Sequence, residues 1–254
     1  MKRVALVAIM VSCLCVALSA QSLTIFCEND PPNQFIGPDG TLSGFTIDVV
    51  HEIQKRIGNS DAIQMVPWAR GYDLIQHQPN VVLFQMTRTA DRNPLFKWVG
   101  PVIEEVFALY SKSDSSIAIS NLEEAKRVGS IGVYLNDVRD LILTKDGFKN
   151  LDRTDDPVIN FKKLMMGRVD LMADSPDSVA DLAKSAGYSV NDVKMVYPFA
   201  KSQIYIAMSL GTSDEVVAKW NGALDSMKSD GSFEKIFKKY YPNHDLPGPA
   251  ITTF

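Results

Sequence analysis

The apolar run at residues 81–86 ends abruptly in polar side chains that could bind a ligand. Thr87 follows the run at once, and Arg88 and Arg92 come next, about one helical turn apart. An almost unbroken apolar run predicts a strand covered on both faces, and ligands of open α/β sheets sit beyond the carboxyl ends of the strands. The planar guanidinium of Arg92 offers paired N–H donors that fit a carboxylate. The alternative is an arginine in a surface helical turn, which is the commoner case for such a motif taken alone.

The chain contains four strand ends of this kind, and all of them are polar. They are Glu28-Asn29-Asp30, Gln85 to Thr87, Leu135-Asn136-Asp137 and Ala173-Asp174-Ser175. Two belong to one half of the protein and two to the other, so halves that face each other would bring all four to one cleft. Helix N-termini there would supply free backbone N–H groups to an anionic ligand group. Polar caps after buried strands are common in α/β proteins, so each end alone indicates little.

The elements that position these residues alternate between strand and helix, which predicts an α/β protein with mainly parallel sheets and right-handed crossovers. The expected strands lie at residues 23–28, 63–66, 81–86, 102–111, 130–134, 169–173, 193–196 and 203–210. The expected helices include residues 45–57, 73–77, 214–228 and 232–241. Trp68 and Arg70 follow the second strand and are further candidate binding residues. Trp68 could stack on a ligand, and packing in the core or at its rim is about equally common.

The first 20 residues predict a secretory signal peptide, because two cationic residues precede an apolar stretch and a small-residue cleavage site. Cys13 and Cys15 lie inside it without a convincing lipid-attachment pattern, so we expect a soluble periplasmic protein rather than a lipoprotein. Cleavage after Ala20 would leave 234 residues with 24 Lys and Arg against 30 Asp and Glu. This acidity argues against a nucleic-acid partner. Cys27 would be the one remaining cysteine, which excludes an intramolecular disulfide.

His51, His77 and His244 are widely scattered, so we expect neither a metal site nor a cofactor.

The motifs Gly44-Phe-x-x-Asp48, Thr89-x-x-Arg92 and Asp230-Gly-x-x-x-x-Ile236 resemble those of the bacterial extracellular solute-binding proteins of family 3. The resemblance covers residues 23–242 and implies a two-lobed type II periplasmic-binding fold. Lobe 1 would comprise residues 21–108 and 206–254, and lobe 2 residues 109–205. The two hinge crossings would lie near 108–112 and 201–205.

The same resemblance implies the roles of individual residues. Arg92 would hold the α-carboxylate of the ligand and Thr87 would assist it, while Asp174, or Ser175 in its place, would hold the ammonium group. The sequence departs from the family's pattern: Asp30 replaces an aromatic residue, Asn136-Asp137 replaces a hydroxyl residue at a helix start, and Gln78-Pro79-Asn80 replaces a Gly-x-x-Asp motif. Asp174 also lies one residue closer to the turn at residues 167–170 than the family's spacing implies. Asp30 indicates a basic or amine-bearing ligand.

The function implied is the capture of an amino acid or similar zwitterion for an inner-membrane ABC permease, by a monomer without catalytic activity. Two alternatives remain open. One is a dehydratase-like enzyme on the same scaffold, with Asp30, Asp137 and Asp174 as candidate acids or bases. The other is a module that presents ligand to a membrane sensor.

Overall fold

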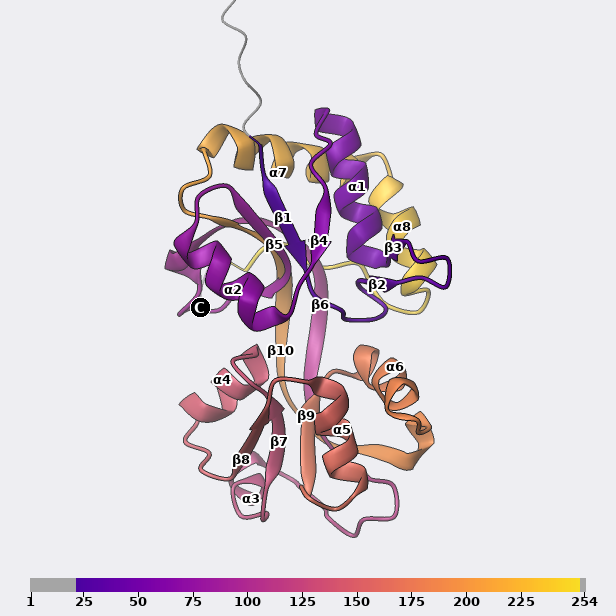
Figure 1. Ribbon diagram of the computed structural model, residues 1–254. Helices are drawn as coiled ribbons and strands as arrows, with labels where there is room; N and C mark the ends of the chain where they lie inside the picture. The colour runs from indigo at the N-terminus through magenta and orange to yellow at the C-terminus, as the bar shows by residue number, and fades with distance from the viewer. Residues whose placement is uncertain (1–21, 252–254) are drawn as a thin grey trace, which may run out of the picture.

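The computed structural model describes residues 22–251 and shows two lobes, one above the other in Figure 1, joined by two long strands. The expected signal peptide lies outside the described residues. The joining strands are β6 (Phe96–Lys112) and β10 (Val193–Ser209), which pair antiparallel along most of their length. Within residues 22–251, none of the helices is both long and apolar enough to cross a bilayer.

The first lobe places a parallel three-stranded unit beside the two long strands. β1 (Thr24–Cys27) lies between β4 (Ile63–Met65) and β5 (Val81–Thr87), and β5 pairs antiparallel with β10. The remaining elements of this lobe are β2 (Phe35–Ile36), β3 (Leu42–Ser43), α1 (Phe45–Ile57), α2 (Trp68–His77), the 3-10 helix η1 (Asn93–Leu95), α7 (Asp214–Ser229) and α8 (Ser232–Tyr240).

Side chains on the two faces of the first-lobe sheet form separate apolar clusters. Successive residues of a strand point to opposite faces. Ile25 and Cys27 of β1 therefore pack with α1, α7 and α8, whereas Phe26 packs with Trp68 and Ile75 of α2. The sheet is thus covered on both faces, as its apolar strands predict.

The second lobe repeats the arrangement with β7 (Ile131–Tyr134) between β8 (Leu151–Thr154) and β9 (Leu171–Asp174), all parallel. β9 pairs antiparallel with β6, so one mixed sheet with the order β4-β1-β5-β10-β6-β9-β7-β8 runs through both lobes. Its helices are α3 (Leu122–Ala125), α4 (Val138–Lys145), α5 (Pro157–Met165), α6 (Pro176–Ala186) and the 3-10 helix η2 (Val190–Asp192).

Three expected strands are parts of two longer ones. Residues 102–111 lie within β6, and residues 193–196 and 203–210 lie within or at the end of β10. The register of β10 shifts between Met195 and Tyr197, between Pro198 and Ala200, and near Tyr205. Such bulges bend a strand without ending it. The expected division into lobes at residues 108–112 and 201–205 falls inside these strands and stays a prediction.

The helix expected at residues 73–77 is wrong at its start, because α2 begins at Trp68. Pro67 is its N-cap residue, with an extended backbone, and proline is well tolerated at helix starts. Trp68 and Arg70 are therefore helical residues rather than parts of a loop.

Candidate functional site

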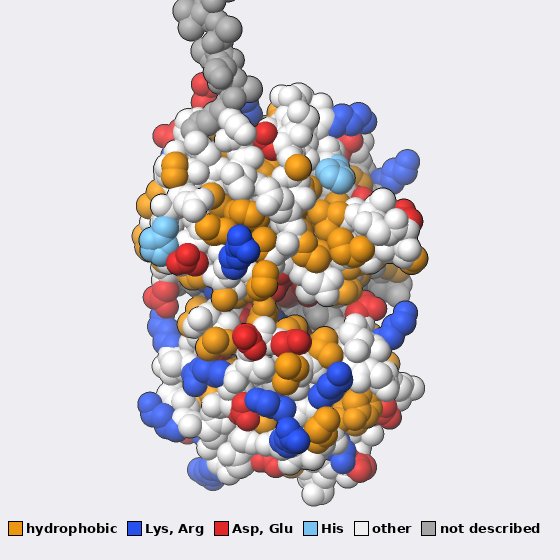
Figure 2. All heavy atoms as spheres, viewed as in Figure 1, with side chains coloured by type: hydrophobic (Ala, Val, Ile, Leu, Met, Phe, Trp, Pro, Cys, Tyr) orange, Lys and Arg blue, Asp and Glu red, His pale blue; other side chains and the backbone are white. Residues whose placement is uncertain are grey.

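A pocket of about 780 Å³, counting the part open to solvent, lies where the two lobes face each other. Figure 2 shows acidic side chains in and beside the furrow between the lobes. The titratable side chains that line the pocket are Glu28, Asp30, Glu105, Tyr134, Asp137, Arg139, Asp174 and Asp181.

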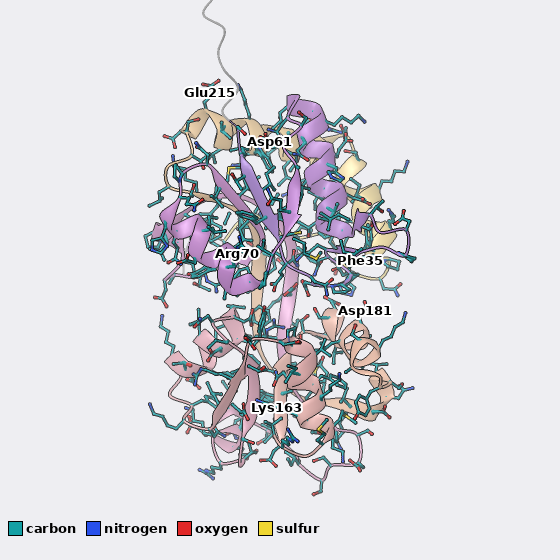
Figure 3. All side chains as sticks on the ribbon, in the orientation of Figure 1. Phe35, Asp61, Arg70, Lys163, Asp181 and Glu215 are labelled. Carbon is teal, nitrogen blue, oxygen red and sulfur yellow. The ribbon has the colours of Figure 1, made fainter. Side chains whose placement is uncertain are left out.

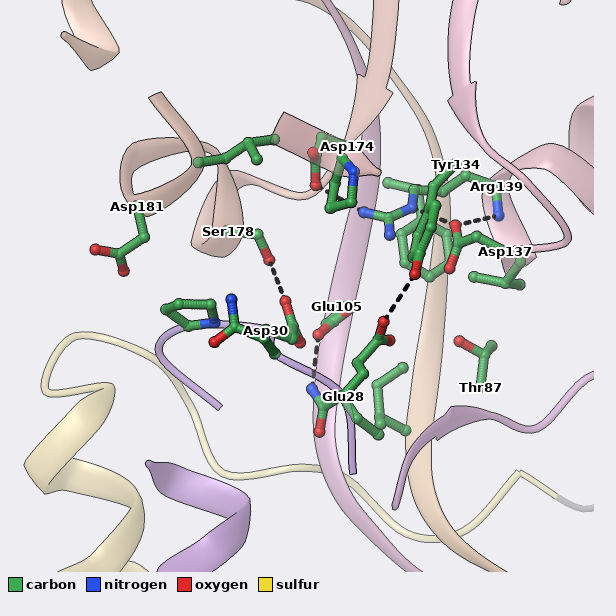
Figure 4. Close-up of a pocket in the computed structure, with 18 of the residues that line it drawn as sticks. Glu28, Asp30, Thr87, Glu105, Tyr134, Asp137, Arg139, Asp174, Ser178 and Asp181 are labelled. Atoms are coloured by element: carbon green, nitrogen blue, oxygen red, sulfur yellow. Dashed lines mark hydrogen bonds and ion pairs between the residues drawn. The ribbon is translucent and has the colours of Figure 1, made fainter. Parts of the chain in front are cut away.

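Three carboxylates form the first-lobe wall of this pocket. Glu28 and Asp30 follow β1, and Glu105 lies in the middle of β6. Tyr134 Oη donates a hydrogen bond to Glu28 (3.3 Å), and Gln85 Nε2 donates one to Glu105 (3.1 Å), as Figure 4 shows. The hydrogen-bond partners of these three carboxylates are neutral side chains, so no ion pair among residues 22–251 compensates them.

Arg139 brings a guanidinium into the pocket from the second lobe. Asp137 caps α4 by accepting a hydrogen bond from the Arg139 backbone N–H (3.0 Å), and this turn also brings the two side chains into an ion pair (Figure 4). Arg139 Nη1 lies 2.7 Å from a carboxylate oxygen of Asp174. The guanidinium carbon lies 5.9 Å from the centre of the Phe107 ring. Two carboxylates and an aromatic face thus hold one cation.

Burial and neighbouring charges shift the pKa values of these carboxylates. Burial, reinforced by Asp30 and Asp137, raises the pKa of Glu28 well above its usual range. Burial also raises the pKa of Asp30 to about 6 and that of Glu105 to about 8, although the charge of Arg139 opposes both shifts. For Asp137, burial acts upward, but the charge and hydrogen bonds of Arg139 outweigh it and leave the pKa below its usual range.

The residues expected from the sequence divide into two groups. Five of them line the pocket: Asp30, Gln85, Thr87, Asp137 and Asp174. The strand ends of both lobes therefore do meet across one cleft. Contact of these five residues with a ligand stays a prediction.

Arg92 is buried but does not line this pocket. Its guanidinium carbon lies 5.5 Å from the ring centre of Trp68 and 5.1 Å from that of Tyr72. Arg92 Nη2 lies 3.4 Å from the backbone oxygen of Asn136 in the second lobe, and Nη1 lies 3.5 Å from that of Thr87. Nη1 and Nη2 thus make long contacts with backbone carbonyls, whereas the buried Nε has no hydrogen-bond partner among the described residues. The carboxylate role of Arg92 stays a prediction.

The other expected residues lie around the pocket rather than in its wall. Trp68 is buried and its Nε1 donates to the oxygen of Asn136 (3.4 Å). Ser175 is buried, with its hydroxyl 3.1 Å from that of Ser178. Arg70 is exposed on α2 of the first lobe (Figure 3). Asp181, a pocket residue that the sequence did not indicate, is half-buried on α6 of the second lobe (Figure 3).

Sequence reasoning did not single out Glu105, Arg139 or Tyr134, and it treated Glu28 as only part of a strand end. Glu105 gives one signal, since Glu104 and Glu105 interrupt an otherwise apolar stretch from Val102 to Tyr110. Arg139 gives no signal, because an arginine in a first helical turn is usually solvent-exposed.

Further contacts join the lobes around the pocket. Ser178 Oγ of α6 donates to Asp30 (3.3 Å), as Figure 4 shows, and His244 Nε2 lies 3.3 Å from Asp177. At the surface, Lys145 of α4 lies 3.1 Å from Asp91. The two walls of the pocket are therefore in contact at its rim.

Known proteins resemble this chain in sequence and in fold. The sequence model of the family of bacterial extracellular solute-binding proteins, family 3, matches residues 23–243 of this chain. The L-cystine-binding protein TcyJ of Escherichia coli (strain K12) is 26% identical over 216 residues, which cover 83% of this chain and 79% of that protein. An ancestral arginine-binding protein, solved with arginine bound, is 26% identical with a TM-score of 0.75, over 87% of this chain and 98% of the other.

A histidine kinase sensor domain with similarity to periplasmic binding proteins gives a TM-score of 0.81 at 17% identity, over 89% of this chain and 98% of that one. At that identity the likeness shows the fold alone. The family match spans almost all of the described residues, and the solved structures share the α/β fold. This chain belongs to the bacterial extracellular solute-binding proteins of family 3.

Proposed function

We propose that this protein captures a small amine-bearing solute, an amino acid or a related compound, between its lobes and delivers it to an inner-membrane ABC permease. The observation that carries the proposal is the pocket itself, whose walls come from both lobes and which is lined by polar residues at strand ends of each, such as Asp30 and Asp174. A ligand that touches both walls favours the closed arrangement of the lobes over any open one.

The relatives support this class of ligand, since one is named for L-cystine and another was solved with arginine, both of which carry amino groups. In this proposal Asp30, Gln85, Thr87, Asp137 and Asp174 contact the ligand directly.

Arg92, Trp68, Asn136, Ser175 and Arg70 act from behind or beside these contacts. Arg92 and Trp68 hold the Asn136 loop against the first lobe, because both donate to its backbone oxygen.

The place of action in this proposal is the periplasm, reached through the signal peptide expected at residues 1–20. The protein acts there as a monomer that needs no cofactor. Closure between residues 108–112 and 201–205 of β6 and β10 would let a permease distinguish loaded from empty protein. Among the described residues, no feature of the pocket specifically favours the sensor or the dehydratase alternative.

A thermal-shift screen tests the proposal with the mature protein. The compounds are the common amino acids, ornithine, cystine, 1,4-diaminobutane, 1,5-diaminopentane and spermidine. A ligand at about 100 times its Kd stabilises a protein by about 2.7 kcal/mol, which for this size raises the Tm by roughly 5–10 °C. Asp30→Asn should diminish that shift, whereas Asp114→Asn, outside the pocket, should keep it. A panel in which no compound raises the Tm would refute the proposed function.

A further inference from the structure

The charge balance of the pocket narrows the class of solute. Six carboxylates line it, from Glu28, Asp30, Glu105, Asp137, Asp174 and Asp181, and Arg139 is the cationic side chain among the described residues that line it. Both partners of that guanidinium are already carboxylates, Asp137 and Asp174. When all six carboxylates are ionised, a zwitterion would leave this excess of negative charge unchanged, whereas a dication would reduce it by two.

The first-lobe wall is the part of the pocket that a cation would satisfy. Glu105 is 9% exposed and accepts a hydrogen bond from the neutral Gln85, and Asp30 accepts from the neutral Asn33 (2.9 Å) and Ser178 (3.3 Å). Buried carboxylates without a cation are costly, and they either take up protons or bind a positive partner. The upward pKa shifts of Asp30 and Glu105 show the first response in the unliganded protein.

A carboxylate on the ligand would find little to hold it here. Arg92, the arginine expected to grip it, is outside the pocket lining, with its guanidinium beside the stacked rings of Trp68 and Tyr72 and 3.4 Å from the oxygen of Asn136. Arg139 already bonds two carboxylates. A third carboxylate at that cation would face the repulsion of both.

We propose that the pocket binds a small organic diamine, with two cationic amines and no carboxylate, and that Glu105 and Asp30 hold one of the two amines. This inference rests on the proposed function, because it assumes that the inter-lobe pocket is the solute site. It departs from the amino-acid ligands for which the relatives are named.

A pair of compounds that differ by one carboxylate tests the inference. 1,5-Diaminopentane is L-lysine without its carboxylate, and both are titrated into the mature protein by calorimetry at pH 8 and low salt. The diamine should bind at least about tenfold more tightly. Equal or tighter binding of L-lysine, or binding of another α-amino acid alone, would overturn the diamine assignment and leave the proposed function standing. Binding of Ca²⁺ alone would overturn both, and so would the absence of any binding.

Two variants place the diamine in the pocket. Glu105→Gln keeps an oxygen for the hydrogen bond from Gln85 but removes the charge, so the affinity for 1,5-diaminopentane should fall about 10- to 100-fold. Asp114→Asn removes a carboxylate that is 76% exposed and lies outside the pocket, and it should change the affinity less than about twofold. Without ligand at pH 8, Glu105→Gln should be at least as stable as the wild type, because it removes a buried like charge. A variant that is less stable but binds the diamine normally would show that Glu105 is merely structural, and would overturn its role.

Discussion

Replacing Arg139 by methionine tests whether the ion-pair cluster of the pocket is a buried one. Arg139 is the shared partner of Asp137 and Asp174, and the side chains of the three residues are 16%, 14% and 8% exposed, respectively. Two unit charges about 4 Å apart interact by about 4 kcal/mol at an effective dielectric constant near 20. Removing one partner of a buried pair costs about 3–5 kcal/mol, because the other charge is left without compensation.

We therefore expect Arg139→Met to lose about 3 kcal/mol of unfolding free energy at pH 7, measured by urea denaturation, or roughly 6–12 °C in Tm. The deficit should shrink as the pH falls from 7 toward 4, because the buried carboxylates of the variant, left without Arg139, then take up protons. In the wild type, Arg139 lowers the pKa of Asp137, so the stability from that group is present above its unfolded pKa and is lost as the pH falls through the folded one. The variant lacks this contribution, and its carboxylates take up protons instead.

Lys145→Met is the matched control for this substitution. It removes the ion pair with Asp91, which also crosses between the lobes but whose side chains are 69% and 76% exposed. An exposed pair of this kind contributes less than about 1 kcal/mol. If Arg139→Met cost no more than Lys145→Met, or if its deficit did not depend on pH, the reasoning about a buried cluster would be refuted.

Three further predictions concern the acidic wall, a glycine and the core. Burial raises the pKa of Asp30 to about 6 and that of Glu105 to about 8, so the contribution of these two groups to the unfolding free energy is complete at low pH and is lost as the pH rises through these values. Urea denaturation of the unliganded protein should therefore show falling stability from pH 5 to 8.5, and a rise would contradict the pKa shifts. Gly44→Ala should cost about 2–4 kcal/mol of unfolding free energy, since φ is 130° and the added Cβ would lie 2.3 Å from a backbone oxygen, whereas Gly222→Ala, in open space on α7, should stabilise by up to about 1 kcal/mol. Phe237→Ala should cost about 3–5 kcal/mol in the same assay and Phe237→Leu less than about 1.5, because the ring is 1% exposed in the first-lobe core; equal costs would show that the site collapses around the truncation.

The fold could be predicted from local patterns because apolar strands, caps and helix periodicity are encoded over short stretches. Asp156 caps α5 and Gly58 ends α1 in a left-handed conformation, both as those rules require. The length of β6 and β10 could not be predicted in this way. Glu104, Glu105 and Lys201 interrupt their apolar pattern, and their pairing partner is distant in sequence.

The site could be predicted at the level of strand ends but not of individual contacts. Asp30 and Asp174 line the pocket because they follow β1 and end β9, which is a local property. The position of the Arg92 guanidinium depends on its contacts with Trp68 and Tyr72 of α2. This helix starts five residues earlier than expected. Which side chains face the pocket is decided by contact between lobes, and no local pattern contains that information.

The course of β10 through both lobes has a consequence for the order in which the chain folds. The first-lobe sheet is completed when residues 204–208 pair with β5. This lobe therefore cannot finish folding until segments near both ends of the chain are present. The strands β7, β8 and β9 lie within one continuous stretch and need no such late arrival. Because distant contacts form more slowly than near ones, we expect the second lobe to gain protected amides before the first in pulsed hydrogen exchange. A nascent protein would then remain incomplete, with β1 and β5 lacking their neighbour, until its last quarter has emerged.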